Sequence, residues 1–276
     1  MSGVFRFGVN MMAPGERAGW VDKCRRAEDL GYDVVCVADH LGMPAPFPAL
    51  VLAAEVTERP KLCPFVLNAA FYNPVLLARE ITTVRDFLGG RLELGLGAGY
   101  AKPEFDEAGI PWESGGRRID RMVAALDALG APGCPLLIGG WGDRMLRLAA
   151  ERADIVAFTG AGAQPDGSLS TLAGAPAFRE RVEFVRAALG EREAELNVLI
   201  QFVDVTADRR GSLERLRPYA PGLSAEELGE LPTLLVGTAE QIAEQLREQR
   251  EKLGLTYISV MERDFEAFAP VIELLR

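Results

Sequence analysis

The sequence predicts an α/β fold, a single (β/α)₈ TIM barrel that occupies residues 1–276 as one domain. Short runs of β-branched and apolar residues alternate along the chain with segments whose apolar residues recur at helical spacing. Eight such runs occur, and strict alternation of strands and helices forces the strands to pair in parallel. No linker marks a second domain, and an open doubly wound sheet is the alternative arrangement.

Glycine, proline and capping residues delimit the expected elements. The strands are expected at residues 5–9, 34–38, 61–67, 91–96, 135–138, 154–158, 196–205 and 257–261. Helices are expected at residues 20–30, 50–57, 74–88, 119–129, 144–151, 178–189 and 238–253. Residues 212–231 are expected to form two short acidic helices, and a last helix is expected from the final strand to residue 275. Asn73 before a proline and Thr238 are expected helix caps. Residues 159–177, rich in Gly, Ala, Ser and Thr, are expected to form a flexible loop.

Composition excludes several functional classes. Hydrophobic residues make up 49% of the chain and charged residues 25%, as in soluble enzymes. A formal net charge of −10 disfavours nucleic acid and anionic membranes as partners. The four cysteines have no CxxC spacing and there is one histidine, so we expect reduced thiols and no metal site. With neither a signal peptide nor an apolar run of about 18 residues, a cytoplasmic protein is expected.

The barrel prediction identifies a set of candidate site residues, because residues that follow parallel strands share one rim. Asp39 and the sole histidine, His40, follow the second strand. An imidazole can donate or accept a proton near neutral pH, and Asp39 or another carboxylate could fix its tautomer. The expected rim residues are Asn10, Asp39, His40, Asn68, Gly97, Ala98, Gly99, Tyr100, Gly139, Gly140, Trp141, Gly142, Thr159, Asp204 and Glu262.

The sequence gives less support to two kinds of hydrolase. The chain lacks the G-x-S-x-G motif of a serine nucleophile, so hydrolysis by a triad is unsupported. A glycoside hydrolase remains an alternative, because Glu104, Asp204 and Glu262 could all reach the rim as paired acids.

Two glycine-rich turns follow strands. GLGAGY, at residues 95–100, is not the dinucleotide fingerprint, and its glycines suit either a tight turn or the close approach of a flat ring. IGGWGDRML, at residues 138–146, lies between a strand and a helix, where free amides and Arg144 would hold a phosphate. Asp143, at the expected N-cap, would compete for those amides.

Four segments together resemble the luciferase-like superfamily, and within it the coenzyme F420-dependent (deazaflavin) oxidoreductases. They are VADH at 37–40, NPVLLAREITTVRDFLGGRLELGLGAGY at 73–100, PLLIGGWGDRMLRLAAERADIVAF at 135–158 and LVGTAEQIAEQL at 235–246. The resemblance covers nearly the whole chain and implies the same barrel fold.

The resemblance also implies residue roles. Asp39 and His40 would lie beside the tricyclic ring, with His40 transferring a proton. Asn68 and Ala69 would form a bulge of the third strand, a place where this superfamily often has a non-proline cis peptide. Gly97, Ala98, Gly99 and Tyr100 would pass along the cofactor. Its phosphate would be held by Gly139, Gly140, Trp141, Gly142 and Arg144.

The main functional prediction is an oxidoreductase that transfers hydride between coenzyme F420 and a small organic or natural-product substrate. An FMN-dependent luciferase-like monooxygenase is the first alternative. The second is a barrel that has lost redox activity and acts as a binding or assembly protein, suggested by the short connection at residues 130–134 and by Asp143. The superfamily commonly dimerises, so a homodimer is possible.

Overall fold

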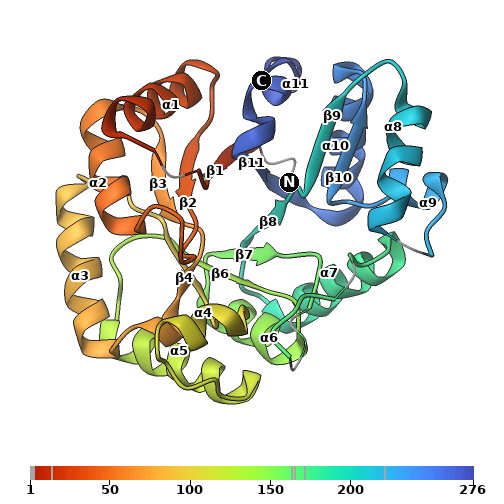
Figure 1. The fold of residues 1–276 in the computed structure, drawn as a ribbon. Helices are drawn as coiled ribbons and strands as arrows, with labels where there is room; N and C mark the ends of the chain where they lie inside the picture. Colours follow the sequence, from red (N-terminus) through yellow and green to blue (C-terminus); the bar gives the residue numbers. More distant parts are fainter. Residues whose placement is uncertain (1–3, 14, 163, 165, 171, 221) are drawn as a thin grey trace.

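The structure, a computed structural model, describes residues 4–13, 15–162, 164, 166–170, 172–220 and 222–276. Its strands form a nearly closed parallel barrel, and the helices surround the strands (Figure 1). The predicted TIM barrel is therefore confirmed.

Within the described residues, the barrel sheet has the strand order β3-β2-β1-β11-β8-β7-β6-β5-β4. The third expected strand is split into β3 and β4, so eight strand positions surround the axis. An isolated parallel bridge between Leu62 and Leu92 joins the two ends of the sheet. The strands are β1 (Arg6–Met11), β2 (Val34–Val37), β3 (Lys61–Pro64), β4 (Leu67–Asn68), β5 (Leu94–Gly97), β6 (Leu136–Gly140), β7 (Ile155–Phe158), β8 (Glu195–Leu199) and β11 (Leu255–Met261), with β9 (Phe202–Val205) and β10 (Leu234–Gly237) in a separate parallel pair.

The helices follow the strands in the expected alternation, and both predicted caps are confirmed. The Asn73 side chain accepts hydrogen bonds from two amides of α3, and Thr238 forms a capping box with Gln241 at the start of α10. The helices are α1 (Arg17–Asp29), α2 (Pro46–Val56), α3 (Pro74–Phe87), α4 (Lys102–Glu107), α5 (Gly115–Leu129), α6 (Asp143–Arg152), α7 (Ala175–Leu189), α8 (Arg209–Leu216), α9 (Ala225–Gly229), α10 (Ala239–Leu253) and α11 (Phe265–Leu275), with short 3₁₀ turns η1 (Ala69–Phe71), η2 (Arg217–Tyr219) and η3 (Glu262–Asp264).

The prediction of one continuous seventh strand at residues 196–205 is wrong. The Ile200 amide donates to the Ser259 carbonyl at 2.7 Å, whereas the next amide, of Gln201, donates to the Thr233 carbonyl at 2.8 Å. The backbone changes its hydrogen-bond partner between these two residues. It therefore leaves the barrel as β9 and pairs with β10, a strand that the sequence pattern did not predict.

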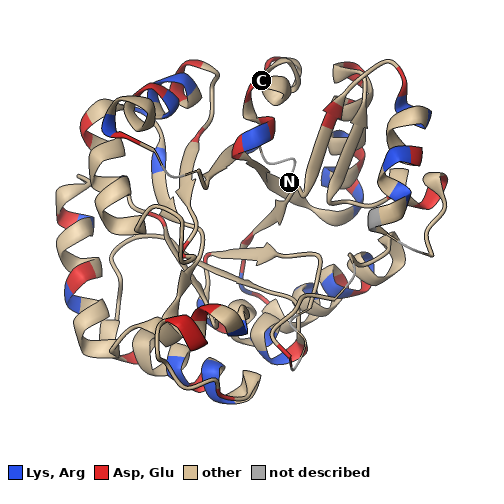
Figure 2. Cartoon of the chain, in the orientation of Figure 1, with Lys and Arg blue, Asp and Glu red and all other residues tan. Residues whose placement is uncertain are grey.

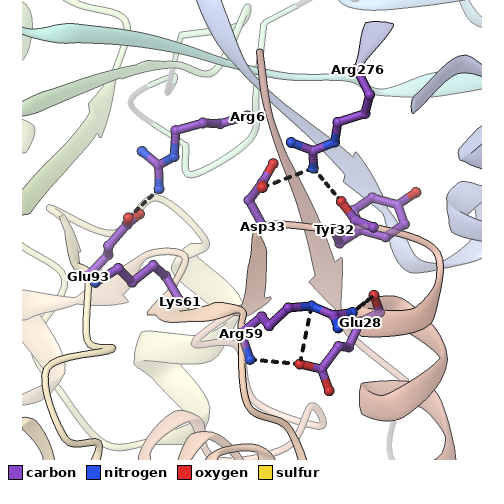
Figure 3. Close-up of a pocket in the computed structure, with 9 residues that line it drawn as sticks. Arg6, Glu28, Tyr32, Asp33, Arg59, Lys61, Glu93 and Arg276 are labelled. Carbon is purple, nitrogen blue, oxygen red and sulfur yellow. Dashed lines mark hydrogen bonds and ion pairs between the residues drawn. The ribbon is translucent and has the colours of Figure 1, made fainter. Parts of the chain in front are cut away.

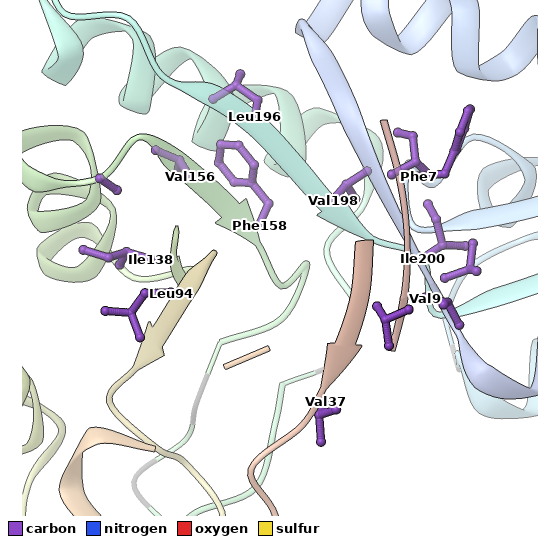
Figure 4. Packing of buried hydrophobic residues seen from close by; sticks show 14 of the residues in the cluster. Phe7, Val9, Val37, Leu94, Ile138, Val156, Phe158, Leu196, Val198 and Ile200 are labelled. Atoms are coloured by element: carbon purple, nitrogen blue, oxygen red, sulfur yellow. The ribbon is translucent and has the colours of Figure 1, made fainter. Parts of the chain in front are cut away.

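Alternate strand residues point to opposite sides of the barrel wall. One set packs outward against the helices and forms the main core, part of which Figure 4 shows, including Val9, Val37, Ile138, Val156 and Val198. The other set fills the barrel interior: Val34, Cys36, Cys63, Phe65, Leu137, Ile155, Ala157 and Tyr257. The interior is thus a packed core rather than a channel, and chemistry is confined to the barrel ends.

The connection after β7 is shorter than the expected loop at residues 159–177, because α7 begins at Ala175. Ala163, Pro165 and Thr171 of this loop lie outside the described residues. Gly167 approaches the start of α4, where a Cβ atom on it would lie only 2.4 Å from Cβ of Lys102. The loop after β7 therefore reaches the helix that follows β5.

Charged residues occur along most of the outer helices (Figure 2). In the part of the chain that the structure describes, no helix has the length and apolarity needed to cross a membrane.

Candidate active site

The histidine lies at the carboxyl end of β2 and is paired with a carboxylate. Nδ1 of His40 lies 2.7 Å from Oε1 of Glu104, which belongs to α4. An ionised carboxylate only accepts hydrogen bonds, so Nδ1 carries the hydrogen and Nε2 is the basic ring nitrogen. Tyr100 stands edge-on to the imidazole, with ring centroids 5.6 Å apart. Burial raises the pKa of the Tyr100 hydroxyl, and the charge of Glu104 adds to the rise.

Asp39 binds backbone and tyrosine rather than the imidazole. Its Oδ2 accepts hydrogen bonds from the Asn68 amide and the Tyr72 hydroxyl, both at 3.0 Å. Burial raises the pKa of the Asp39 carboxyl, although these two hydrogen bonds and the nearby His40 oppose the rise. Asp39 therefore ties the end of β2 to β4 and η1, and the tautomer of His40 is fixed by Glu104 instead.

The interruption of the third strand is displaced from its expected position. A non-proline cis peptide bond joins Phe65 to Val66, whereas the prediction placed the bulge at Asn68 and Ala69, so that prediction is wrong in position. Asn68 ends β4 in regular pairing, and its side-chain oxygen accepts a hydrogen bond from the Ala70 amide at 3.2 Å. Ala69 opens η1 and is buried.

The three glycines of GLGAGY face the interrupted strand. A Cβ atom on any of them would collide with residue 64, 66 or 68: Gly95 with the Pro64 carbonyl at 2.1 Å, Gly97 with Cγ2 of Val66 at 2.6 Å, and Gly99 with Oδ1 of Asn68 at 2.3 Å. Residues 95, 97 and 99 therefore lack a Cβ atom at the places where residues 64, 66 and 68 of the neighbouring strand pack against them. This packing explains the spacing of the glycines without a ligand. Ala98, between them, is partly buried against the core.

The second glycine-rich turn combines packed and open positions. A Cβ atom on Gly139 would touch Val66 at 3.3 Å, and one on Gly140 would collide with Met145 at 2.2 Å. Gly142 differs, because a Cβ atom there would meet nothing within 4 Å. It is the N-cap of α6 and has no side-chain capping bond, so the first amides of α6 are not capped by a side chain.

The expectation that Asp143 is the N-cap of α6 is wrong, because Gly142 occupies that position. Asp143 is the first residue of α6 rather than its N-cap, and its carboxylate binds Arg181. Arg144 is turned toward α5, where it donates to the Gly116 carbonyl at 2.8 Å and binds Asp120 at 2.5 Å. The competition between Asp143 and an anion for the α6 amides is thereby reduced.

Trp141 belongs to this turn and contacts elements that follow it in the chain. Its ring centroid is 5.5 Å from that of Phe178 in α7, and a Cβ atom on Gly162 would lie 3.4 Å from its ring. Trp141 therefore packs against α7 and the loop after β7.

Two carboxylates expected at the rim have structural partners. Oε2 of Glu262 accepts hydrogen bonds from the Met12 and Ala13 amides at 2.6 and 2.7 Å, and its other oxygen binds Lys23. Asp204 lies on β9 and binds Ser212, so its predicted place at the barrel rim is wrong. The two carboxylates are thus bound to partners other than His40, which weakens the glycoside hydrolase alternative.

A cavity of about 650 Å³ lies at the opposite, amino-terminal end of the barrel (Figure 3). Its charged lining groups are paired with one another or with neighbours. Arg6 binds Glu93 and, beside the cavity, Glu195, while Arg276 binds Asp33 at 2.9 Å. A guanidinium stays protonated at accessible pH values, so the arginines of this cavity do not supply a group for proton transfer. The described residues also contain no group of His, Cys, Asp and Glu that could hold a metal ion.

Two of the known proteins that this chain resembles in sequence are named as a reductase and a dehydrogenase. The chain is 35% identical over 150 residues to 5,10-methylenetetrahydromethanopterin reductase of Archaeoglobus fulgidus, covering 46% of this chain and 45% of the reductase. It is 36% identical over 118 residues to F420-dependent glucose-6-phosphate dehydrogenase of Kribbella flavida, covering 40% of this chain and 35% of that enzyme. The chain thus matches less than half the length of either relative.

A solved structure shares the fold over the whole chain. An F420-dependent secondary alcohol dehydrogenase in complex with an F420-acetone adduct has a TM-score of 0.77 at 17% identity, covering 99% of this chain and 100% of that one. A family model described as luciferase-like monooxygenase matches residues 2–257. This protein therefore belongs to the luciferase-like monooxygenase family.

Proposed function

We propose that this protein is an oxidoreductase that transfers hydride between coenzyme F420 and a small organic or natural-product substrate. The observation that carries the proposal is the His40–Glu104 pair, 2.7 Å apart at the carboxyl end of the barrel. When a secondary alcohol loses hydride from its carbon, its hydroxyl proton must leave as well, and a basic imidazole nitrogen can take it. Relatives named as F420-dependent dehydrogenases support this assignment.

The chain's own groups have distinct roles in this reaction. His40 acts through Nε2 as base for alcohol oxidation and, in the reverse direction, as acid for carbonyl reduction. Glu104 stabilises the imidazolium that forms and keeps the hydrogen on Nδ1. Asp39 acts indirectly, because its two hydrogen bonds hold the Asn68 backbone and Tyr72 at the rim. The His40 side chain is 26% exposed, so a small molecule can reach it.

Coenzyme F420, when bound, supplies the ring carbon that accepts or donates hydride. Asn68, Ala69 and residues 97–100 would lie along the ring, and residues 139–142 with Arg144 would hold the phosphate. The first amides of α6 suit an anion, because the N-cap is a glycine and Asp143 is engaged by Arg181. Arg144 would exchange Asp120 for the phosphate.

Parallel anaerobic titrations with F420 and FMN, followed by ring absorbance and fluorescence, test the cofactor. The expected result is saturable binding of F420, followed by its reduction when secondary alcohols are added. Binding and oxidation of reduced FMN without any binding of F420 would overturn the proposal.

An FMN-dependent monooxygenase is the second candidate function, favoured by the description of the matching family model. It requires oxygen uptake coupled to oxidation of reduced FMN, which an oxygen electrode measures. Failure to bind either cofactor would instead favour a binding or assembly protein, for which the short connection at residues 130–134 is the motivation.

We further propose a homodimer formed through α3. Leu76 and Phe87 are 50% and 68% exposed, and their spacing of eleven residues places them on one helix face. Two exposed apolar side chains on one face are suited to a second copy of the helix. Sedimentation equilibrium should report a dimer that Phe87→Glu dissociates. A monomer at high protein concentration would contradict this proposal.

A further inference from the structure

The carboxylate that binds His40 lies on an element that cannot fix its own position. Helix α4 has six residues, and its N-cap Ala101 forms no side-chain capping bond. Helices this short are unstable alone, so tertiary contacts must hold α4. One such contact is Phe105, which is 1% exposed and packs against Phe71 and Trp112 at ring centroid distances of 5.1 and 5.0 Å.

A second contact is a buried guanidinium that fastens both ends of the segment carrying α4. Arg118, in the first turn of α5, is 4% exposed. Its Nε donates to the Gly99 carbonyl at 3.1 Å, and its Nη1 donates to the Glu113 carbonyl. Gly99 precedes α4 and Glu113 follows it. The guanidinium also stacks on the Trp112 ring, 3.8 Å from its centroid.

If packing were the only requirement at this position, a buried arginine would cost more stability than an apolar residue. Burial lowers the pKa of the Arg118 guanidinium, although the nearby charge of Glu113 opposes the shift. The Glu113 carboxylate forms its ion pair with Arg121, and among the described residues no carboxylate lies within salt-bridge distance of Arg118. Burying a charge without a direct ion pair costs more than burying an apolar side chain of similar length. An apolar side chain, however, could not donate hydrogen bonds to two carbonyls.

The Gly99 end of this arrangement leads directly to the site. Gly99 has φ of +74° and lies against the Asn68 side chain, and the next residue, Tyr100, stands beside the His40 ring. The same carbonyl that Arg118 holds therefore sets the start of the segment that brings Glu104 to His40.

We propose that Arg118 is a positioning residue, which holds Glu104 against Nδ1 of His40 by fastening the two ends of the 99–113 segment. It touches neither the imidazole nor any reacting atom. Its importance for turnover rests on the proposed function, but the positioning itself can be measured without cofactor or substrate.

The single histidine provides that measurement. In protein labelled with ¹⁵N only in its histidine ring, NMR reports one imidazole, and nitrogen chemical shifts distinguish the Nδ1–H from the Nε2–H tautomer. The wild type should be mainly Nδ1–H, and Glu104→Ala should shift it toward Nε2–H. Arg118→Met should cause much of the same shift, and Arg118→Lys, which retains one donor, should fall between Met and wild type.

Arg144→Met is the matched control. Arg144 also donates to a first-turn carbonyl of α5, that of Gly116, but among the described residues it forms no hydrogen bond or ion pair with residues 99–113, and its side chain is 55% exposed. Its removal should leave the histidine spectrum unchanged.

Circular dichroism establishes which variants fold. A folded Arg118→Met protein with a wild-type histidine spectrum would overturn the proposal, and so would a wild-type spectrum in Glu104→Ala. If Arg118→Met does not fold, Arg118→Lys decides by the same criterion. Lack of F420 activity in the wild type would instead refute the proposed function and leave this result intact. With activity present, Arg118→Met should lower kcat, leave the Kd for F420 near normal, and be partly rescued by Lys.

Discussion

At the amino end of the barrel Arg6 joins Glu93 to Glu195, whereas at the carboxyl end His40 faces the single carboxylate of Glu104. Both ends carry charge, and the amino end has the cavity of about 650 Å³. The difference lies in the kind of group. Arginine stays charged at all accessible pH values, so its ion pairs stabilise the fold, whereas an imidazole changes its protonation near neutral pH. The kind of titratable group, rather than cavity size, distinguishes the end that we propose to be active.

The largest expected effect comes from removing the imidazole. His40→Ala should reduce turnover by about 10²- to 10⁴-fold, the contribution of a general acid or base, with little change in F420 affinity. Stability should change by less than about 1 kcal/mol, because the ion pair is partly exposed. Steady-state kinetics and urea unfolding measure the two quantities. Unchanged turnover would show that the imidazole is structural.

The amino end should respond in the opposite way. Arg6→Met leaves the Glu93 carboxylate buried without its cation, and should lower the free energy of unfolding by about 3 kcal/mol with kcat unchanged. The double variant Arg6→Met with Glu93→Met also removes the buried carboxylate, leaves only the more exposed Glu195 without its cation, and should recover part of that loss. If turnover fell by more than the decrease in the fraction of folded protein, the amino and carboxyl ends of the barrel would be coupled.

Packing at the carboxyl end should matter at its glycines. Gly97→Ala brings a Cβ atom to 2.6 Å from Val66, and overpacking of this kind costs about 1–3 kcal/mol. Adding Val66→Ala should relieve it. Gly19→Ala, at an exposed position in α1 with no neighbour within 4 Å, is the control and should stabilise by about 0.5–1 kcal/mol. Equal effects at the two sites would contradict the packing account of the GLGAGY motif.

The smallest expected effect is the pH dependence contributed by Asp39. Because burial raises its pKa, the folded protein binds this proton more tightly than the unfolded chain. Stability from this group is therefore present at low pH and decreases as the pH rises through the unfolded value of about 3.9 and then the higher folded value.

Asp39→Asn removes the charge, while its oxygen can still accept from the Asn68 amide and the Tyr72 hydroxyl. The variant should equal or exceed wild type at about pH 7 by up to about 1 kcal/mol, with the advantage shrinking toward about pH 4. Urea unfolding at both pH values tests this. A stability advantage of Asp39→Asn that grows as the pH falls would contradict the predicted direction of the pH dependence.

Much of the fold follows from local patterns. Alternation, glycine stops and the caps at Asn73 and Thr238 are properties of short segments, and they suffice for the barrel. The exit of the chain between Ile200 and Gln201 does not follow from the pattern, because both residues continue an extended run and only their distant hydrogen-bond partners differ. Helix α4 lies between the expected strand at residues 91–96 and the expected helix at residues 119–129, where no element was predicted; its proline is in the first helical turn, where proline is tolerated.

The position of the candidate site was proposed from the sequence, but its contacts were not. A lone histidine after a barrel strand identified His40, and Glu104 was among the carboxylates considered for the rim. Their pairing joins residues 64 positions apart and depends on α4, so no spacing rule could reveal it. The role of Gly95, Gly97 and Gly99 was likewise hidden, because it requires knowledge of where the third strand breaks.

The most direct test of a cofactor site at the carboxyl end is an F420 titration observed at the His40 ring. In protein labelled with ¹⁵N only in histidine, oxidised F420 should shift the imidazole signals saturably, with the same dissociation constant as cofactor fluorescence. Arg6→Met should leave that constant unchanged. Saturable F420 binding that leaves the His40 signals unmoved, or no binding at all, would contradict the account.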